Sequence, residues 1–96
     1  MEGPLITISI PTFNSEKFLK LCLDAIEAQS YKNFEINIVD GGSKDATIEI
    51  AKAQGIKNIV VCKESLLKSR FIGAEKAKGE YILLLDSDQL LDATAL

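Results

Sequence analysis

The sequence contains no histidine and only two cysteines. Without histidine, zinc sites of the usual kinds are nearly excluded, and so are Ser-His-Asp and Cys-His catalysis. Cys22 and Cys62 are far apart in the chain, and neither belongs to a CxxC motif. We therefore expect both cysteines to be reduced residues of the core.

Long apolar runs and an excess of positive charge are also missing. No apolar run approaches the roughly 20 residues that cross a membrane, and the start of the chain lacks the basic segment and apolar core of a signal peptide. The formal net charge of −3 offers no broad basic surface for nucleic acid. We therefore expect no transmembrane segment and no nucleic-acid partner, and a location in the cytoplasm or at the cytoplasmic face of a membrane.

The composition is that of a folded globular domain, with 47% hydrophobic and 26% charged residues. A chain of this length buries roughly 60 to 70 per cent of its unfolded surface, which is enough for one core but not for two. No internal repeat, low-complexity tract or linker divides the sequence. Residues 1–96 are therefore expected to form a single domain.

Apolar segments of strand type alternate with segments of helical periodicity. The expected strands span residues 5–10, 34–39, 58–62 and 81–85, and the expected helices span residues 15–29, 45–54 and 65–78. Pro11 should end the first strand, and Asn14 or Ser15 should cap the first helix. Gly55 and Gly79 are placed to end the second and third helices.

This βαβαβαβ order with short connections implies right-handed crossovers and a parallel sheet. The predicted fold is α/β: a Rossmann-like, three-layer α/β/α arrangement with a mostly parallel sheet and the strand order 3-2-1-4.

The same patterns predict which side chains are buried. Phe18 belongs to the expected apolar face of the first helix, and Phe71 to that of the third. Residues 81–85 show no polar alternation, which is typical of a strand covered on both faces. The predicted order nevertheless puts this fourth strand at the sheet edge, where an uncovered apolar strand favours association, most simply a homodimer through strand 4. Alternatively, residues 89–96 fold back over that edge.

The apolar run at residues 81–85 ends abruptly in Asp86-Ser87-Asp88. In a doubly wound sheet, ligands bind outside the carboxyl ends of the strands. Carboxylate oxygens are preferred ligands of hard divalent cations, and Mg²⁺ commonly takes only one or two of them, completing its shell with water and phosphates. Asp86 and Asp88 are therefore candidate ligands of a metal and diphosphate site. The alternative is that one aspartate caps a turn and the other is solvated.

Two further polar segments should converge on the same crevice. The order 3-2-1-4 places a topological switch between strands 1 and 4, so Pro11 to Asn14 and Asp86 to Asp88 should flank the same crevice. Asp40, at the exit of the second strand, should face the crevice as well. Each position keeps a structural alternative: Pro11 as a strand stop, Asn14 as a helix cap, and Asp40 as part of a turn with the glycines that follow it.

Other nucleotide-binding motifs are not found. The first strand is followed by neither GxGxxG nor GxxxxGK[ST], which argues against the common dinucleotide and P-loop sites.

Four blocks of the sequence, taken together, resemble the family 2 glycosyltransferases of GT-A fold. The blocks are residues 8–14, residues 39–45, Arg70 with Gly73, and residues 77–88. They cover almost the whole chain in the order and spacing of that family.

The resemblance implies a role for each matched residue. The residues that would border the nucleotide base and ribose are Pro11, Thr12, Phe13 and Asn14. Asp40 would contact base or ribose, and Arg70 would lie near the nucleotide, although Arg70 could instead pair with Glu75 or another surface acid. Asp86 would face the ribose and, with Asp88, hold Mg²⁺ or Mn²⁺ on the diphosphate.

The sequence departs from the family pattern in two residues and in length. Many relatives have a second acid in place of Gly41 and an asparagine in place of Phe71. Family members also continue well beyond the D-x-D motif, through the half that supplies acceptor contacts and the catalytic base, whereas this chain ends eight residues after Asp88. We therefore assign no catalytic residue.

The resemblance implies the N-terminal, nucleotide-sugar-binding portion of an inverting glycosyltransferase, with a UDP- or GDP-linked sugar as partner. Two alternatives stay open. One is a binding module or remnant that holds nucleotide and metal without transfer. The other is a nucleotidyltransferase on a related fold, which would usually carry a glycine-rich, basic loop after its first strand.

Overall fold

The computed structural model describes residues 3–86, and strands and helices alternate through all of them. The elements are β1 (Ile6–Thr12), α1 (Leu19–Glu27), β2 (Phe34–Asp40), α2 (Thr47–Ala53), β3 (Asn58–Val61), α3 (Leu66–Glu75) and β4 (Tyr81–Leu84). Their order is the predicted one. No helix in this described part of the chain is both long and apolar enough to cross a membrane.

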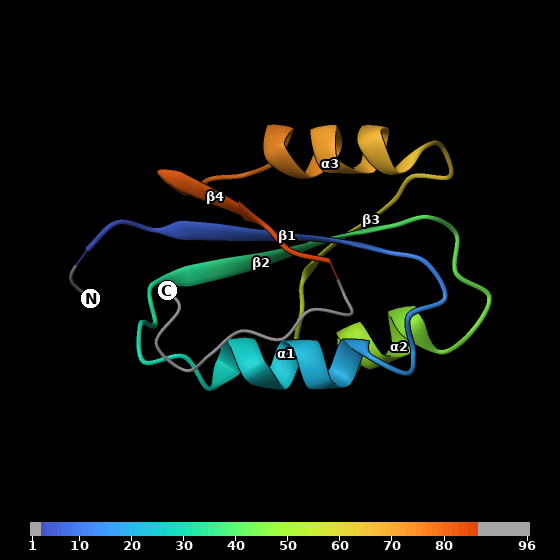
Figure 1. The fold of residues 1–96 in the computed structure, drawn as a ribbon, viewed down its shortest axis with the longest axis horizontal. Coiled ribbons are helices and arrows are strands. Elements are labelled where there is room, and N and C mark those ends of the chain that lie inside the picture. The colour runs from blue at the N-terminus through green and yellow to red at the C-terminus, as the bar shows by residue number, and fades with distance from the viewer. Residues whose placement is uncertain (1–2, 87–96) are drawn as a thin grey trace.

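The four strands form one parallel sheet with the order β3-β2-β1-β4, which confirms the predicted topology. The helix α3 covers one face of the sheet, and α1 and α2 cover the other (Figure 1). The molecule is therefore a three-layer, Rossmann-like α/β/α structure, as the alternation of elements predicted.

The two faces of the sheet differ in chemistry. Because successive side chains of a strand point to opposite faces, β1 and β2 present isoleucines to one helix layer and mostly polar side chains to the other. The apolar face joins a core made of Ile8, Ile10, Leu19, Cys22, Leu23, Ile26, Ile36, Ile38, Ala51 and Leu85. The face under α3 carries Thr7, Ser9, Glu35 and Asn37. The main hydrophobic core is thus on the side of α1 and α2.

Small side chains let α3 lie close to this polar face. Ser69 and Gly73 are buried one turn apart, and a Cβ atom at Gly73 would lie 1.9 Å from Ser9 Oγ. Phe71 is 58% exposed, so its expected place in the core is wrong. The apolar residues of α3 are spaced so that they share one face of the helix. However, α3 turns the face with its small residues toward the sheet instead.

The strand β1 continues through Pro11 to Thr12, so the expectation that Pro11 ends the strand is wrong. Ser9 C=O accepts a hydrogen bond from Leu85 N–H on the β4 side. Residues two apart in a parallel strand direct their backbone groups to the same side, so the Pro11 nitrogen also faces β4. The pairing with β4 ends at Ser9, and the missing N–H of Pro11 therefore breaks no ladder bond.

The helix α1 buries Cys22 and Ile26 of its expected apolar face, but not Phe18. Its buried residues are Leu19, Cys22, Leu23 and Ile26. They follow the i, i+3, i+4, i+7 spacing, which places Phe18 on the flank of that face, where it is exposed. The expected side-chain cap is also wrong, because the helix begins without one; Ser15 C=O instead accepts the N–H groups of Phe18 and Leu19. Cys22 and Cys62 are both buried, as predicted.

The edge strand β4 is covered on one face only. Its register places Ile82 beside Thr7 and Leu84 beside Ser9, on the face that α3 shares, but α3 packs mainly against β1 and β2. Ile82 and Leu84 are consequently exposed, whereas Leu85 belongs to the core on the opposite face. The expectation of cover on both faces is therefore wrong for the described residues. Residues 89–96, the alternative cover, lie outside them.

The close contact of α3 with the sheet can be tested by Gly73→Ala. The added methyl group would overlap Ser9 Oγ, so we expect the free energy of unfolding to fall by about 1–2 kcal/mol in urea denaturation. Phe71→Ala is the matched control in the same helix: it removes a whole ring, yet should change stability by less than about 1 kcal/mol because the ring is exposed. If Gly73→Ala stabilised the protein, as helix propensity alone would predict, the close contact would be refuted.

Candidate functional site

The candidate site lies at the end of the sheet where the strands finish. Thr12 and Asp40 are register partners at the ends of β1 and β2. Leu85 N–H donates to Ser9 C=O over 3.0 Å, so Asp86 leaves the sheet next to the end of β1. The structure therefore brings three of the predicted segments to one edge, as expected for the carboxyl ends of parallel strands.

The buried carboxylate of Asp40 holds this edge together. Oδ1 accepts hydrogen bonds from Thr12 Oγ1 and Ser43 Oγ, both over 2.6 Å. Oδ2 accepts the N–H groups of Gly42 and Ser43, over 2.9 and 2.7 Å. Burial alone would raise the pKa of Asp40, but the hydrogen bonds from Ser43, Thr12 and Gly42 outweigh it and hold this pKa below its usual range. Asp40 is therefore an ionised, fully hydrogen-bonded residue.

These contacts favour the structural alternative for Asp40. An ionised carboxylate offers about four acceptor positions, and four donors already occupy them. Asp40 thus fixes the loop from residue 41 to 43, in which Gly42 takes a φ of +95° that suits glycine. Direct contact between Asp40 and a nucleotide stays a prediction.

Asn14 is tied to the same loop. Its N–H donates to Ser43 Oγ over 2.8 Å, and its side-chain Oδ1 accepts Lys44 N–H over 2.9 Å. Asn14 takes a φ of +47°, a conformation that asparagine tolerates better than most residues. The segment after β1 and the segment after β2 therefore form one hydrogen-bonded unit.

A cleft of about 400 Å³ opens beside this unit. It is lined by Pro11, Thr12, Phe13, Gly41, Lys63, Glu64 and Ser69. Phe13 is 61% exposed and packs beside Gly41, where a Cβ would lie 3.2 Å from the ring. The ring of Phe13 thus lies against the place that a side chain at position 41 would take, in the lining of the cleft.

Sequence reasoning missed three of these lining residues. Lys63 and Glu64 follow β3 after Cys62, so the predicted strand order alone would have placed them at the same edge of the sheet. Ser69 is in the first half of α3, and only the packing of that helix on the sheet brings it to the cleft.

Arg70 and Asp86 form an ion pair between α3 and the exit of β4. Arg70 Nη2 and Asp86 Oδ1 are 3.0 Å apart, and the two side chains are 38% and 46% exposed. Both residues were predicted near the nucleotide, and the structure places them together. A half-exposed ion pair is worth only about 0–1 kcal/mol, so a ligand can displace it at little cost.

Asp88 lies outside the described residues, and so does Ser87. Within residues 3–86, no group of three acidic or cysteine side chains gathers as a ready metal site. Asp86 still fits a hard divalent cation, because Mg²⁺ needs only one or two carboxylates when phosphates and water complete its shell.

A Rossmann-like sheet with a cleft, a braced loop and an Asp–Arg pair at its carboxyl end defines a ligand-binding α/β domain. Its family follows from sequence: the profile described as Glycosyl transferase family 2 matches residues 7–96, so the chain belongs to that family.

Two relatives illustrate the match in sequence. An uncharacterized glycosyltransferase of Haemophilus influenzae is 36% identical in an alignment 103 positions long, which covers 95% of this chain and 39% of the relative. Glycosyltransferase GlyA of Streptococcus pneumoniae is 37% identical in an alignment 92 positions long, which covers 91% of this chain and 13% of that protein. The chain thus spans well under half the length of these relatives.

Two solved structures share the fold. TarS 1–349 of S. aureus, in complex with UDP-GlcNAc, has a TM-score of 0.84 at 27% identity, over 92% of this chain and 28% of TarS 1–349. The mannosyltransferase PcManGT of Pyrobaculum calidifontis, in complex with GDP-Man and Mn²⁺, has a TM-score of 0.85 at 25% identity, over 94% of this chain and 29% of PcManGT.

The hydrogen bonds of Asp40 predict a pH-dependent stability. Because the folded pKa is lowered, this stabilisation is complete above the unfolded pKa of about 4 and is lost as the pH falls through the folded value. Asp40→Asn should reduce the decline in unfolding free energy below about pH 4. At pH 7 it should cost about 1–3 kcal/mol, because an amide N–H₂ would face the donors of Gly42 and Ser43.

Urea denaturation between about pH 7 and pH 2.5 measures both effects. Asp24→Asn is the control, since it removes an exposed carboxylate whose pKa is lowered by the hydrogen bond from Lys20 on the surface. We expect a smaller change of slope for this variant. Equal acid profiles for Asp40→Asn and the unsubstituted protein would refute the role given to Asp40.

Proposed function

We propose that residues 1–96 are the nucleotide-sugar-binding unit of a longer GT-A domain, in an inverting glycosyltransferase that uses a UDP- or GDP-linked sugar. One observation carries the proposal: Phe13, Arg70 and Asp86 come from three different segments to the carboxyl end of one sheet. The family match and the complexes of TarS with UDP-GlcNAc and of PcManGT with GDP-Man support it. The cytoplasmic location expected from the sequence stays a prediction.

The cleft suits the nucleoside part of such a ligand. Phe13 offers an exposed aromatic face to a base, and Pro11 and Thr12 form the adjacent wall. The loop that Asp40 braces keeps this wall in place before a ligand arrives. Preorganisation of this kind favours affinity because less conformational freedom is lost on binding.

The Asp86–Arg70 pair suits the diphosphate part. Arg70 orients Asp86 through their ion pair and, once displaced, supplies a positive charge close to the phosphates. Asp86 and Asp88 are the proposed ligands of the cation. Mg²⁺ or Mn²⁺, when bound, offsets the negative charge that develops on the departing nucleoside diphosphate.

Sugar transfer in the intact enzyme would proceed by in-line attack of an acceptor hydroxyl on the anomeric carbon, with a carboxylate base that removes the hydroxyl proton. No residue of this chain is assigned as that base. A module that binds without transfer is therefore the second candidate. The nucleotidyltransferase alternative is weaker, because the segment after β1 lacks a glycine-rich, basic loop.

Divalent-dependent binding of a nucleoside diphosphate tests the proposal. Calorimetric titration with UDP and with GDP should show binding in Mn²⁺ and none in EDTA. Asp88→Asn should weaken binding most, by about tenfold or more, because it removes a hard anionic ligand while nearly preserving shape. Asp24→Asn, on the outer surface of α1, is the control and should bind normally. Equal affinity with and without EDTA would exclude the metal role.

We also propose that the open edge at β4 pairs two copies of the chain. Within residues 3–86 no further strand pairs with the outer edge of β4, and the exposed side chains of Ile82 and Leu84 make this edge apolar, which favours association. Sedimentation velocity at micromolar concentration should show a dimer that Leu84→Lys converts to a monomer. Leu21→Lys, at an equally exposed leucine on α1, should leave the dimer intact. A monomeric unsubstituted protein with β4 amides protected from hydrogen exchange would favour the alternative cover by residues 89–96.

A further inference from the structure

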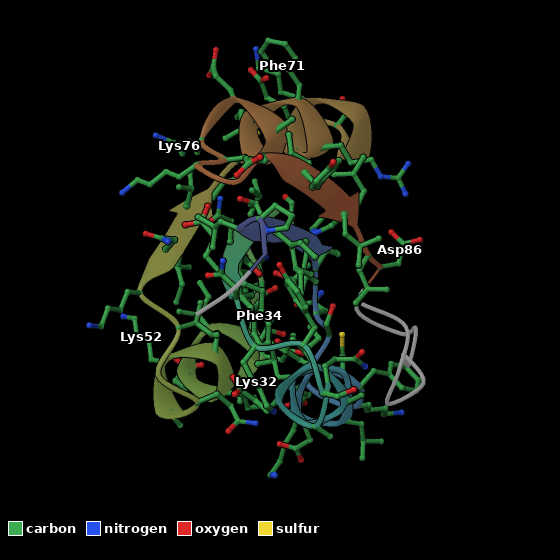
Figure 2. The ribbon with its side chains drawn as sticks, turned by 90° about the vertical axis from the view of Figure 1, so that its left-hand side faces the viewer. Lys32, Phe34, Lys52, Phe71, Lys76 and Asp86 are labelled. Carbon is green, nitrogen blue, oxygen red and sulfur yellow. The ribbon has the colours of Figure 1, made fainter. Side chains whose placement is uncertain are left out.

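A second cleft lies over β2 and β3, under the C-terminal half of α3, and its lysines lie toward the end of the sheet where the strands begin. Its volume is about 350 Å³, at the small end of the range of about 300–1,000 Å³ for ligand pockets. Its floor comes from β2 and β3, and Gly73 of α3 forms part of its roof. Figure 2 views the molecule from this end, with Lys76 on the β3 side of α3 and Asp86 on the far side beyond β4.

The floor of this cleft contains an unpartnered amide. Asn37 is only 4% exposed, and neither its Nδ2 nor its Oδ1 has a hydrogen-bond partner among the described residues. It lies on the same face as Val39, whose Cγ2 is 3.6 Å from the position of a Cβ at Gly73, and therefore faces α3 across the cleft. Asn58 is its register partner on β3 and lies on the same face.

A buried amide without hydrogen-bond partners lowers the stability of the folded protein. Leaving its donors and acceptor unsatisfied costs about 1–3 kcal/mol, and an apolar residue in the same strand would avoid that cost. Most buried polar groups are satisfied by protein, by water or by a ligand. The amide of Asn37 can both donate and accept, which matches the hydrogen-bonding capacity of hydroxyl groups.

The rim of the cleft is positively charged. Lys57 precedes β3, and Lys76 and Lys78 follow α3, so three lysines line one opening. No acidic side chain is among the described residues that line it. Glu35, on the neighbouring part of β2, already accepts Lys78 N–H over 2.9 Å and the hydroxyl of Thr7 through its Oε2. Lysine ammonium groups bind phosphate as point charges.

From these observations we propose that this cleft binds a phosphate group carried by a small polyhydroxyl compound. The phosphate sits among Lys57, Lys76 and Lys78, and a hydroxyl group reaches Asn37. The same chemistry occurs in a free polyol phosphate and in a lipid headgroup. This site lies apart from the proposed nucleotide cleft, so it does not depend on the function proposed above.

NMR titration of the 96-residue protein tests this site directly. Glycerol 3-phosphate, inorganic phosphate and glycerol are added separately, up to about 10 mM at low ionic strength, where exposed charges are least screened. We expect glycerol 3-phosphate to shift the side-chain amide signals of Asn37, to bind more tightly than phosphate, and to lose affinity as salt is added. Glycerol alone should leave these signals unchanged.

Three variants separate the site from general surface charge. Asn37→Leu keeps the branching and the number of heavy atoms of the side chain and removes an unsatisfied polar group next to the open cleft, so it should fold at least as stably and bind glycerol 3-phosphate about 3- to 10-fold more weakly. Lys76→Gln should weaken binding by about 2- to 5-fold. Lys52→Gln, on α2 in the other helix layer, is the matched control and should bind normally.

A second experiment decides whether the phosphate belongs to a lipid headgroup or to a free polyol phosphate. Co-sedimentation with phosphatidylglycerol vesicles that Asn37→Leu weakens would assign the cleft to a lipid headgroup, whereas soluble binding alone would assign it to a free polyol phosphate. The proposal is overturned if neither probe binds, if Asn37→Leu binds like the unsubstituted protein, or if Lys52→Gln is as damaging as Lys76→Gln. Binding of UDP with Mn²⁺ should be the same in all three variants, so failure of either site can be recognised independently.

Discussion

The hydrogen-bonded carboxylate of Asp40 is the interaction on which the ligand-binding end of the sheet depends. It joins the end of β1, through Thr12, to the loop after β2, through Gly42 and Ser43. Because the charge is buried, any rearrangement that removes a donor leaves an ion unsatisfied in the protein interior, which is strongly unfavourable. The loop is therefore held in one conformation. The hydrogen bond from Asn14 N–H to Ser43 Oγ holds the segment after β1 in place as well. One buried carboxylate therefore organises the wall of the cleft.

The strand order and the location of the site could be predicted from sequence because both follow from connectivity. Alternating strands and helices with short connections leave few right-handed arrangements, and in the order 3-2-1-4 the segments after β1, β2 and β4 must share an edge. The pairing of Arg70 with Asp86 could not be obtained in this way. It depends on the height at which α3 crosses the sheet, and that height is determined by the contact of Gly73 with Ser9.

Burial was harder to predict because periodicity identifies residues that share a face but not whether anything covers that face. Phe71 and Phe18 fitted apolar patterns and are exposed, since α3 packs through small residues and α1 is rotated relative to the expected helix. The exposed side chains of β4 have the same explanation, because α3 passes mainly over β1 and β2. Asn37 lies in a segment whose apolar residues predicted a buried strand. Its side chain is buried, but on the polar face of the sheet under α3.

The unequal faces of the sheet explain how so small a domain can present two clefts. The isoleucines on the α1 side supply the apolar burial that stabilises the fold, so the opposite face is free to carry Thr7, Ser9, Glu35 and Asn37. A helix on a polar face gains little from burying large apolar side chains, and α3 instead makes a close contact at one glycine. The proposed nucleotide cleft lies by Ser69, on one side of that contact, and the lysine-rimmed cleft extends from Gly73 on the other. Ser69 and Gly73 are one turn apart on α3. The position of this one helix therefore determines the shape of both clefts.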